Sequence, residues 1–168
     1  MDGVLGYRLQ RGSGLDRALL VKFMQRTHAE ISPGENLKHL AETVEQHLSK
    51  ETPLWWAYLD ASEGSASSKK ANQPVGCLWM GNAVDQRSGE RHAYVLLLFV
   101  DPEHRRRGLA SALLKQGEQW AIQRGDRQLA LQVLSTNQPA LQLYQKLGYL
   151  PASVLMTKSL DSPGNAEA

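Results

Sequence analysis

The stretch Phe99–Leu114, "FVDPEHRRRGLASALL", decides the fold, because it joins an apolar run to a helix through three arginines and a glycine. The run that leads into it, His92–Val100, is nearly all apolar, which is typical of a strand buried on both faces at a sheet centre. Leucines then recur at helical spacing, so we expect a helix of about twenty residues that ends at Gly125. Another strand, Arg127–Leu134, follows, and a strand, a helix and a strand in succession predict a parallel crossover.

The arginines Arg105–Arg107 admit three interpretations. A helix N-terminus exposes unpaired amide groups and favours an anion, and Gly108 lets the backbone come close to a ligand. Arginines there would add donors for phosphate oxygens. As composition alone, the stretch fits a solvated basic turn equally well, and a nucleic-acid patch is the third possibility. A Walker loop is excluded, because no Lys-Ser/Thr follows the glycine.

The N-terminal part predicts a strand, two helices and two further strands. Ser32 and Glu35 stand three apart with Pro33 between them, a capping-box pattern that predicts the start of the second helix, which runs to Leu48. The predicted strands are Gly6–Gly12, Pro53–Asp60 and Val75–Asn82, and the first helix carries Leu15, Leu19, Leu20, Phe23 and Met24. We expect a flexible loop around residues 61–72 and a hairpin turn at Asp85–Arg91.

The C-terminal part predicts one more helix and a last strand. Ser135, Thr136 and Asn137 are cap candidates, Pro139 falls in the first turn, and Gly148 ends the helix. Residues 153–160, "SVLMTKSL", predict the last strand, and residues 161–168 predict a flexible tail. We therefore expect a single domain over residues 1–160.

Composition and residue spacing limit the classes of function that the chain can have. A chain of 168 residues with 42% hydrophobic content suits one globular domain, and a formal charge of +2 is too small to indicate a polyanion partner. The single cysteine, Cys77, excludes an internal disulfide and is interpreted as a core thiol. No histidine or cysteine spacing indicates a metal, and no apolar run indicates a membrane span or leader. We expect a cytoplasmic protein without a metal or a nucleic-acid partner.

Two motifs together resemble the GNAT superfamily of acyl-CoA-dependent N-acetyltransferases. The pyrophosphate signature of that family, Arg/Gln-x-x-Gly-x-Gly/Ala, matches Arg105, Gly108 and Ala110. Its second signature matches "NQPALQLYQKLGY", Asn137–Tyr149, about thirty residues further on. The two motifs cover the C-terminal third of the chain.

The resemblance implies an α/β (α+β) GNAT fold, with a mixed sheet of six to seven strands, about four flanking helices and splayed fourth and fifth strands. It also implies that acetyl-CoA is the cosubstrate and that Tyr144 is the general acid that protonates the departing thiolate. Asn137 would cap its helix and contact the pantetheine arm. The implied cofactor-binding residues are Leu98, Phe99, Val100, Arg105, Arg106, Arg107, Gly108, Leu109, Ala110, Ser111, Asn137 and Tyr144.

The general base stays open. Many members of the family keep a glutamate on the fourth strand, but His92–Val100 holds no carboxylate. His92 and Tyr94 are the nearest titratable side chains and are the candidates for a base or a water relay, and the leading hypothesis is a water relayed from the backbone or from Tyr94. Glu90 and Asp85 lie in the preceding turn, and His92 could equally be an exposed hairpin residue.

The acceptor implied by the resemblance is a primary amine, either a peptide N-terminus or a small molecule. Trp55 and Glu30 are the candidate acceptor residues, although adjacent Trp55 and Trp56 must point to opposite faces of their strand. A homodimer is possible. The alternative function is a non-catalytic acyl-CoA-binding sensor or structural module, which the missing glutamate keeps open.

Overall fold

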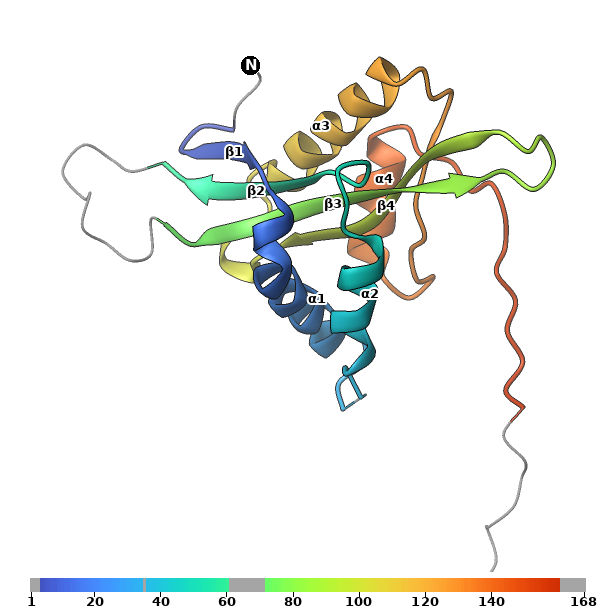
Figure 1. The fold of residues 1–168 in the computed structure, drawn as a ribbon, viewed down its shortest axis with the longest axis horizontal. Coiled ribbons are helices and arrows are strands. Elements are labelled where there is room, and N and C mark those ends of the chain that lie inside the picture. Colours follow the sequence, from blue (N-terminus) through green and yellow to red (C-terminus); the bar gives the residue numbers. More distant parts are fainter. Residues whose placement is uncertain (1–3, 35, 61–71, 161–168) are drawn as a thin grey trace, which may run out of the picture. The chain divides into compact units, whose positions relative to one another are not determined.

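The computed structural model describes residues 4–34, 36–60 and 72–160, and these form two compact units, Met1–Gln132 and Val133–Ala168. Figure 1 traces the chain through both. The predicted single domain over residues 1–160 stays a prediction. The expected tail, 161–168, and residues 61–71 of the expected loop lie outside the described residues.

The first unit is built on a mixed five-stranded sheet in the order β1-β2-β3-β4-β5. The first four strands pair antiparallel with their neighbours, whereas β5 is parallel to β4, as the predicted crossover requires. The strands are β1 (Tyr7–Arg11), β2 (Leu54–Leu59), β3 (Pro74–Val84), β4 (Arg91–Val100) and β5 (Leu129–Ala130). The α/β fold is thus confirmed, with five strands in the described part where six to seven were expected.

Helices cover both faces of this sheet. Figure 1 shows α1 (Arg17–Ile31) and α2 (His39–His47) on one side and α3 (Leu109–Gln123) on the other. Large side chains from α1 and α2, including Leu20, Phe23 and Leu40, form one core with Trp56 and Phe99 of the sheet. On the opposite face, a Cβ added at Gly117 of α3 would lie 2.9 Å from a Met80 side-chain atom, so the helix packs closely on β3.

The start of the second helix differs from the prediction. Ser32 is the C-cap of α1, and its amide donates to the carbonyl of His28 at 2.7 Å. Pro33 follows at once, and proline is common just after a helix end because it cannot continue the helix. Helix α2 begins only at His39, after the Asn36 side chain accepts a bond from the Lys38 amide. The predicted capping box at Ser32 was therefore wrong.

The second unit contains α4 (Gln138–Lys146), with the predicted signals at both ends. The Asn137 side chain accepts from the Ala140 amide at 3.3 Å, and Gly148 has a φ of 90°. The last predicted strand is absent, because residues 153–160 are exposed and pair with no strand among the described residues. An isolated strand has no partner for its backbone groups, so its apolar pattern alone does not form one.

Candidate active site

A β-bulge interrupts β4 near the middle of the strand. Trp79 of β3 pairs with Leu97, but the next residue, Met80, pairs with Val95, so Leu96 is the extra residue. Below and above this point the two strands keep a regular register. A bulge bends its strand and leaves one residue unpaired in the ladder. The bulge thus marks the point at which β4 turns away from regular pairing.

The bulge also decides which side chains of β4 share a face. Leu97 and Phe99 lie in the core under α1 and α2. Residues that pair across antiparallel strands point to the same face, and Tyr94 pairs with Gly81, two residues from Trp79 in the same core. Tyr94 and His92 therefore lie on the face of Leu97 and Phe99, although the residue numbers have changed from odd to even.

Strands β4 and β5 pair only before the bulge. Ala93 pairs with Leu129 and Tyr94 with Ala130, and the parallel ladder then ends. The backbone of Leu96–Val100 consequently has no β5 partner in the sheet. This confirms the expected arrangement, in which the fourth and fifth strands pair at their start and splay further on.

The N-terminus of α3 offers free amide groups next to this strand end. Its N-cap is Gly108, with a φ of 83° and no side-chain cap, and the first bond of the helix runs from the Ala112 amide to the Gly108 carbonyl at 3.0 Å. The amides of the first turn before Ala112 have no acceptor within the helix. Arg106 also has a positive φ, 62°. Left-handed residues in a turn orient successive amides into an anion-binding concavity.

Of the three arginines, two are held by other parts of the chain. Arg107 donates from Nη1 to the hydroxyl group of Tyr7 on β1 at 3.0 Å, and the same hydroxyl lies 2.9 Å from Nδ1 of His104. Arg105 is bound to Glu30 and to the carbonyl of Val100. Arg106 has no hydrogen-bond or ion-pair partner in the described part of the chain. Its guanidinium is the one left available for a ligand.

The candidate bases differ in their surroundings. His92 is 7% exposed, and its Nδ1 is buried without a hydrogen-bond partner among the described residues. His92 is thus not the exposed hairpin residue that was the alternative. Burial raises the pKa of Tyr94 above its usual value, which keeps its phenol protonated. Asp85 accepts bonds from the amides of Arg87 and Ser88, and these bonds lower its carboxyl pKa.

Other sequence candidates have structural surroundings of their own. Trp55 is buried, with the Arg11 guanidinium 4.8 Å from its ring centroid. Cys77 is fully buried, and burial raises the pKa of its thiol far above the usual range, so the core-thiol interpretation is confirmed. In the second unit, Tyr144 packs edge-on against Tyr149, with ring centroids 5.8 Å apart. Burial raises the pKa of the Tyr144 phenol.

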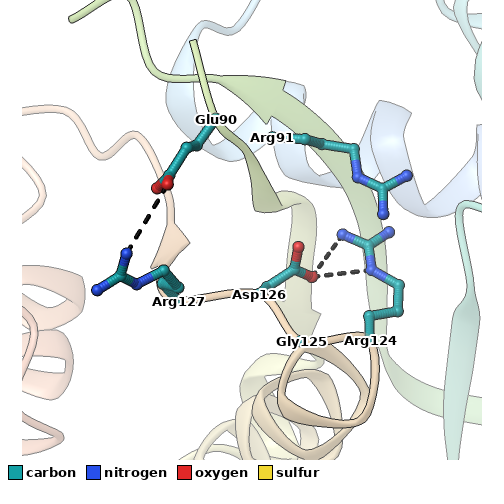
Figure 2. A pocket seen from close by; sticks show the side chains of 6 residues that line it. All are labelled: Glu90, Arg91, Arg124, Gly125, Asp126 and Arg127. Atoms are coloured by element: carbon teal, nitrogen blue, oxygen red, sulfur yellow. Dashed lines mark hydrogen bonds and ion pairs between the residues drawn. The ribbon is translucent and has the colours of Figure 1, made fainter. Parts of the chain in front are cut away.

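A separate polar pocket of about 280 Å³ lies at the far end of α3 from Gly108 (Figure 2). Its lining residues are Glu90, Arg91, Arg124, Gly125, Asp126 and Arg127. The Arg124 guanidinium donates to one oxygen of Asp126 at 2.5 and 2.8 Å, and Arg127 faces Glu90 at 3.8 Å. Most of the charged side chains that line the pocket are thus paired with one another. The pocket lies at the turn that joins α3 to β5.

Comparison with known proteins agrees with this geometry. Residues 24–149 match the family model described as the acetyltransferase (GNAT) family. The chain belongs to the GNAT family. The match begins within α1 and includes both sequence motifs, so membership rests on most of the chain and not on the arginine stretch alone.

Individual relatives are more distant. An uncharacterised N-acetyltransferase of Methanocaldococcus jannaschii is 30% identical over 99 residues, which are 56% of this chain and 42% of that protein. This chain therefore spans less than half the length of that relative. A putative acetyl transferase from Pyrococcus furiosus has a TM-score of 0.74 at 21% identity, over 92% of this chain and 99% of its own. A structure described as a predicted acetyltransferase with acetyl-CoA, from Clostridium acetobutylicum, has a TM-score of 0.72 at 18% identity, over 92% and 96%. These structures confirm the fold.

Neither a metal-binding cluster nor a membrane-spanning helix is present among the described residues. No group of three or more His, Cys, Asp or Glu side chains is arranged there to hold a metal ion. No helix in that part of the chain has the length and apolar character needed to cross a membrane.

The contacts of Tyr7, His104 and Arg26 had no signal in the sequence, because their partners lie 75 to 100 positions away.

Proposed function

We propose that the protein is an N-acetyltransferase that moves the acetyl group of acetyl-CoA directly to a primary amine, either a peptide N-terminus or a small molecule. The observation that carries the proposal is the succession of a bulged strand and an uncapped helix. Strand β4 loses its β5 partner after Tyr94 and leads, within ten residues of Phe99, to the free amides of α3. This succession would suit a cofactor with a long polar arm and an anionic pyrophosphate.

The cofactor would bind along this path. The pyrophosphate would accept bonds from the amides of Gly108–Ser111 and from the free guanidinium of Arg106. The pantetheine arm would bond the edge of Leu98–Val100 in β4 that faces away from β3 and has no β5 partner, and Asn137 is proposed as a further contact. The acetyl carbonyl would then lie near the bulge, where a backbone amide can stabilise a developing oxyanion.

The reaction proposed is a direct displacement. The neutral amine nitrogen attacks the thioester carbon, a C–N bond forms, and the carbonyl oxygen becomes an oxyanion. The oxyanion then collapses, the C–S bond breaks, and the electron pair leaves with the coenzyme A sulfur. One proton passes from the amine nitrogen to a base, and another passes from Tyr144 to the thiolate, which gives the acetylated amine and free coenzyme A.

His92 is a better candidate for the base than Tyr94. A base must accept a proton near neutral pH, and the burial that raises the pKa of Tyr94 keeps that phenol in its protonated form. The buried, unpartnered Nδ1 of His92 is free to accept a bond, directly or through water. Tyr94 would then act as a protonated relay on the same strand face.

Tyr144 is proposed as the acid on its motif and its chemistry. Burial raises the pKa of this phenol, so it carries its proton when the thiolate leaves. The test is release of coenzyme A thiol from acetyl-CoA with peptides, lysine peptides, polyamines, aminoglycosides and amino acids as acceptors, with Tyr144→Phe in parallel. Turnover on one class that falls by about a hundredfold in the variant would support the proposal.

A non-catalytic acyl-CoA sensor is the second candidate, and the lack of a carboxylate on β4 favours it. A sensor would release no thiol with any acceptor, yet acetyl-CoA would raise its melting temperature. A ligand at a hundred times its dissociation constant stabilises a fold by about 2.7 kcal/mol, which a thermal scan detects. If the chain shows no turnover and acetyl-CoA does not raise its melting temperature, both candidates are contradicted.

A further inference from the structure

Two ion pairs join helix α1 to the loop between β4 and α3, and the helix supplies the positive charge in one pair and the negative charge in the other. Arg26 and Glu30 lie one turn apart on α1, and residues four apart share a helix face. Arg26 pairs with Asp101, and Glu30 pairs with Arg105. The helix thus presents a positive and then a negative charge, and the loop presents the reverse. We call these four residues the α1 clamp.

The donors of Arg105 are directed at the protein. Its Nε donates to the carbonyl of Val100 at 2.8 Å, and one terminal nitrogen donates to both carboxylate oxygens of Glu30, at 2.7 and 2.9 Å. A guanidinium that contacted a phosphate through these nitrogens would have to leave both partners. This geometry fits a residue that fixes the loop better than a residue that binds the ligand.

The clamp is centred on Phe99. The guanidinium carbons of Arg26 and Arg105 lie 5.0 and 5.7 Å from the centroid of this ring, within the range of a cation–π contact. The Phe99 side chain is buried in the core under α1, and its backbone belongs to the β4 segment that has no β5 partner. Helix α1, the end of β4 and the loop before α3 are therefore held at one point.

We infer that Glu30 and Arg105 are positioning residues, which set the affinity for acetyl-CoA by holding the loop that leads to the α3 amides. This inference rests on the proposed function and refines it, because it moves Arg105 from the phosphate ligands to their support. It also moves Glu30 from the acceptor site to the cofactor side. Arg106 and the α3 amides remain as the pyrophosphate contacts.

The variant Glu30→Gln separates the two roles of Arg105 by the sign of its effect. If Arg105 positions the loop, loss of the ion pair loosens the loop and weakens acetyl-CoA binding by about three- to fivefold, the range of a partly exposed pair. If Arg105 were instead a phosphate ligand, release from Glu30 would free it and tighten binding. Removing a negative charge near an anion also favours tighter binding, so weakening cannot come from bulk charge.

The matched control is Glu103→Gln, which makes the same charge change within the loop that Glu30 contacts, at an exposed residue without a partner in the described part of the chain. Acetyl-CoA affinity is measured by titration calorimetry on the full chain, and steady-state kinetics then compare KM with kcat. The expected result for Glu30→Gln is a raised KM for acetyl-CoA with kcat changed by less than about twofold, and no weakening in the control. Unchanged or tighter binding in Glu30→Gln overturns the inference.

The exchange Glu30→Arg with Arg105→Glu adds a rescue test. Each single change should weaken binding, and the double variant should recover most of the affinity, because the pair is restored in reverse. A double variant that binds worse than either single change would place Arg105 at the phosphate and overturn the inference. If the wild-type chain binds no acetyl-CoA, the proposed function itself fails, which this series shows before any variant is compared.

Discussion

The Tyr7 hydroxyl on the edge strand β1 accepts a hydrogen bond from Arg107, a residue one hundred positions further along the chain. The same hydroxyl bonds His104, so one phenol holds both ends of the short turn that precedes α3. The α1 clamp holds this loop from the other side through Arg105. The loop before the candidate pyrophosphate site is therefore fixed by two elements that are remote in sequence.

We expect Tyr7→Phe to lower the free energy of unfolding by about 1–2 kcal/mol, because it removes two partly buried hydrogen bonds and keeps the ring. Urea unfolding measures this change. The control is Tyr58→Phe, which deletes a phenol oxygen that has no hydrogen-bond partner among the described residues and should leave the stability nearly unchanged. Equal effects in the two variants would contradict a role for the Tyr7 hydroxyl.

Replacing Gly108 should reduce stability through backbone strain alone. Its φ of 83° is disfavoured for a residue with a Cβ, and an added Cβ would meet nothing closer than 3.9 Å, so no clash contributes. We expect Gly108→Ala to cost about 1–2 kcal/mol and to weaken acetyl-CoA binding, measured by thermal unfolding and calorimetry. Gly14→Ala, at a glycine with open space and no positive φ, should be close to neutral.

The ion pair at the C-terminal end of α3 should contribute more than those on the surface. The Asp126 side chain is 4% exposed and holds Arg124, which also donates to the Asn82 side chain at 2.6 Å. Asp126→Asn leaves a largely buried guanidinium without its counter-charge, so we expect a loss of about 2–3 kcal/mol in urea unfolding. Glu90→Gln breaks only an exposed pair at 3.8 Å and should cost less than about 1 kcal/mol. A larger loss in Glu90→Gln would contradict this ranking.

The Cys77 thiol should be unreactive in the folded protein. Thiolate is the reactive form, and full burial raises the thiol pKa well above its usual value. A disulfide reagent at pH 8 should label the native chain only as fast as it opens, and should label it at once in urea. Rapid labelling of the native chain would contradict the core position.

The same thiol makes stability fall at alkaline pH. Below the usual thiol pKa of about 8.5 both states hold the proton, so the group has no effect on the pH dependence. Above it the unfolded thiol ionises while the folded thiol does not, and stability declines as the pH rises. Cys77→Ala should show a shallower decline in unfolding experiments between pH 8 and about 10.

Local signals in the sequence predicted the parts of the fold that depend on neighbouring residues. The left-handed Gly125 and Gly148 ends, the Asn137 cap and the parallel crossover were all confirmed, because each depends on a few adjacent residues or on element order. Ser32 misled, because the same residues also end α1: the Ser32 amide donates to the His28 carbonyl, and Pro33 cannot continue the helix. Cap patterns alone do not decide between the end of one helix and the start of the next.

The site was predictable in kind but not in its contacts. The motif located Gly108 and the free amides of α3, since these follow from chain geometry. The partners of Arg105 and Arg107 come from α1 and β1, and no local pattern links residues 75 or 100 positions apart. A consecutive arginine run could therefore be recognised, whereas the division between its one free and two engaged members could not.

The extra residue in β4 makes the strand behave as two halves that are out of phase. Before Leu96 the even-numbered side chains face α1 and α2, and after it the odd-numbered ones do. If the strand kept Leu96 but formed a regular ladder onward from the Leu97–Trp79 pair, Leu96 would lie opposite Met80 and every earlier residue of β4 would shift by one position. His92 and Tyr94 would then exchange the α1 face for the α3 face, and the chemistry proposed for them would move to the wrong side of the sheet. The bulge at Leu96 is therefore what keeps both side chains on the α1 face.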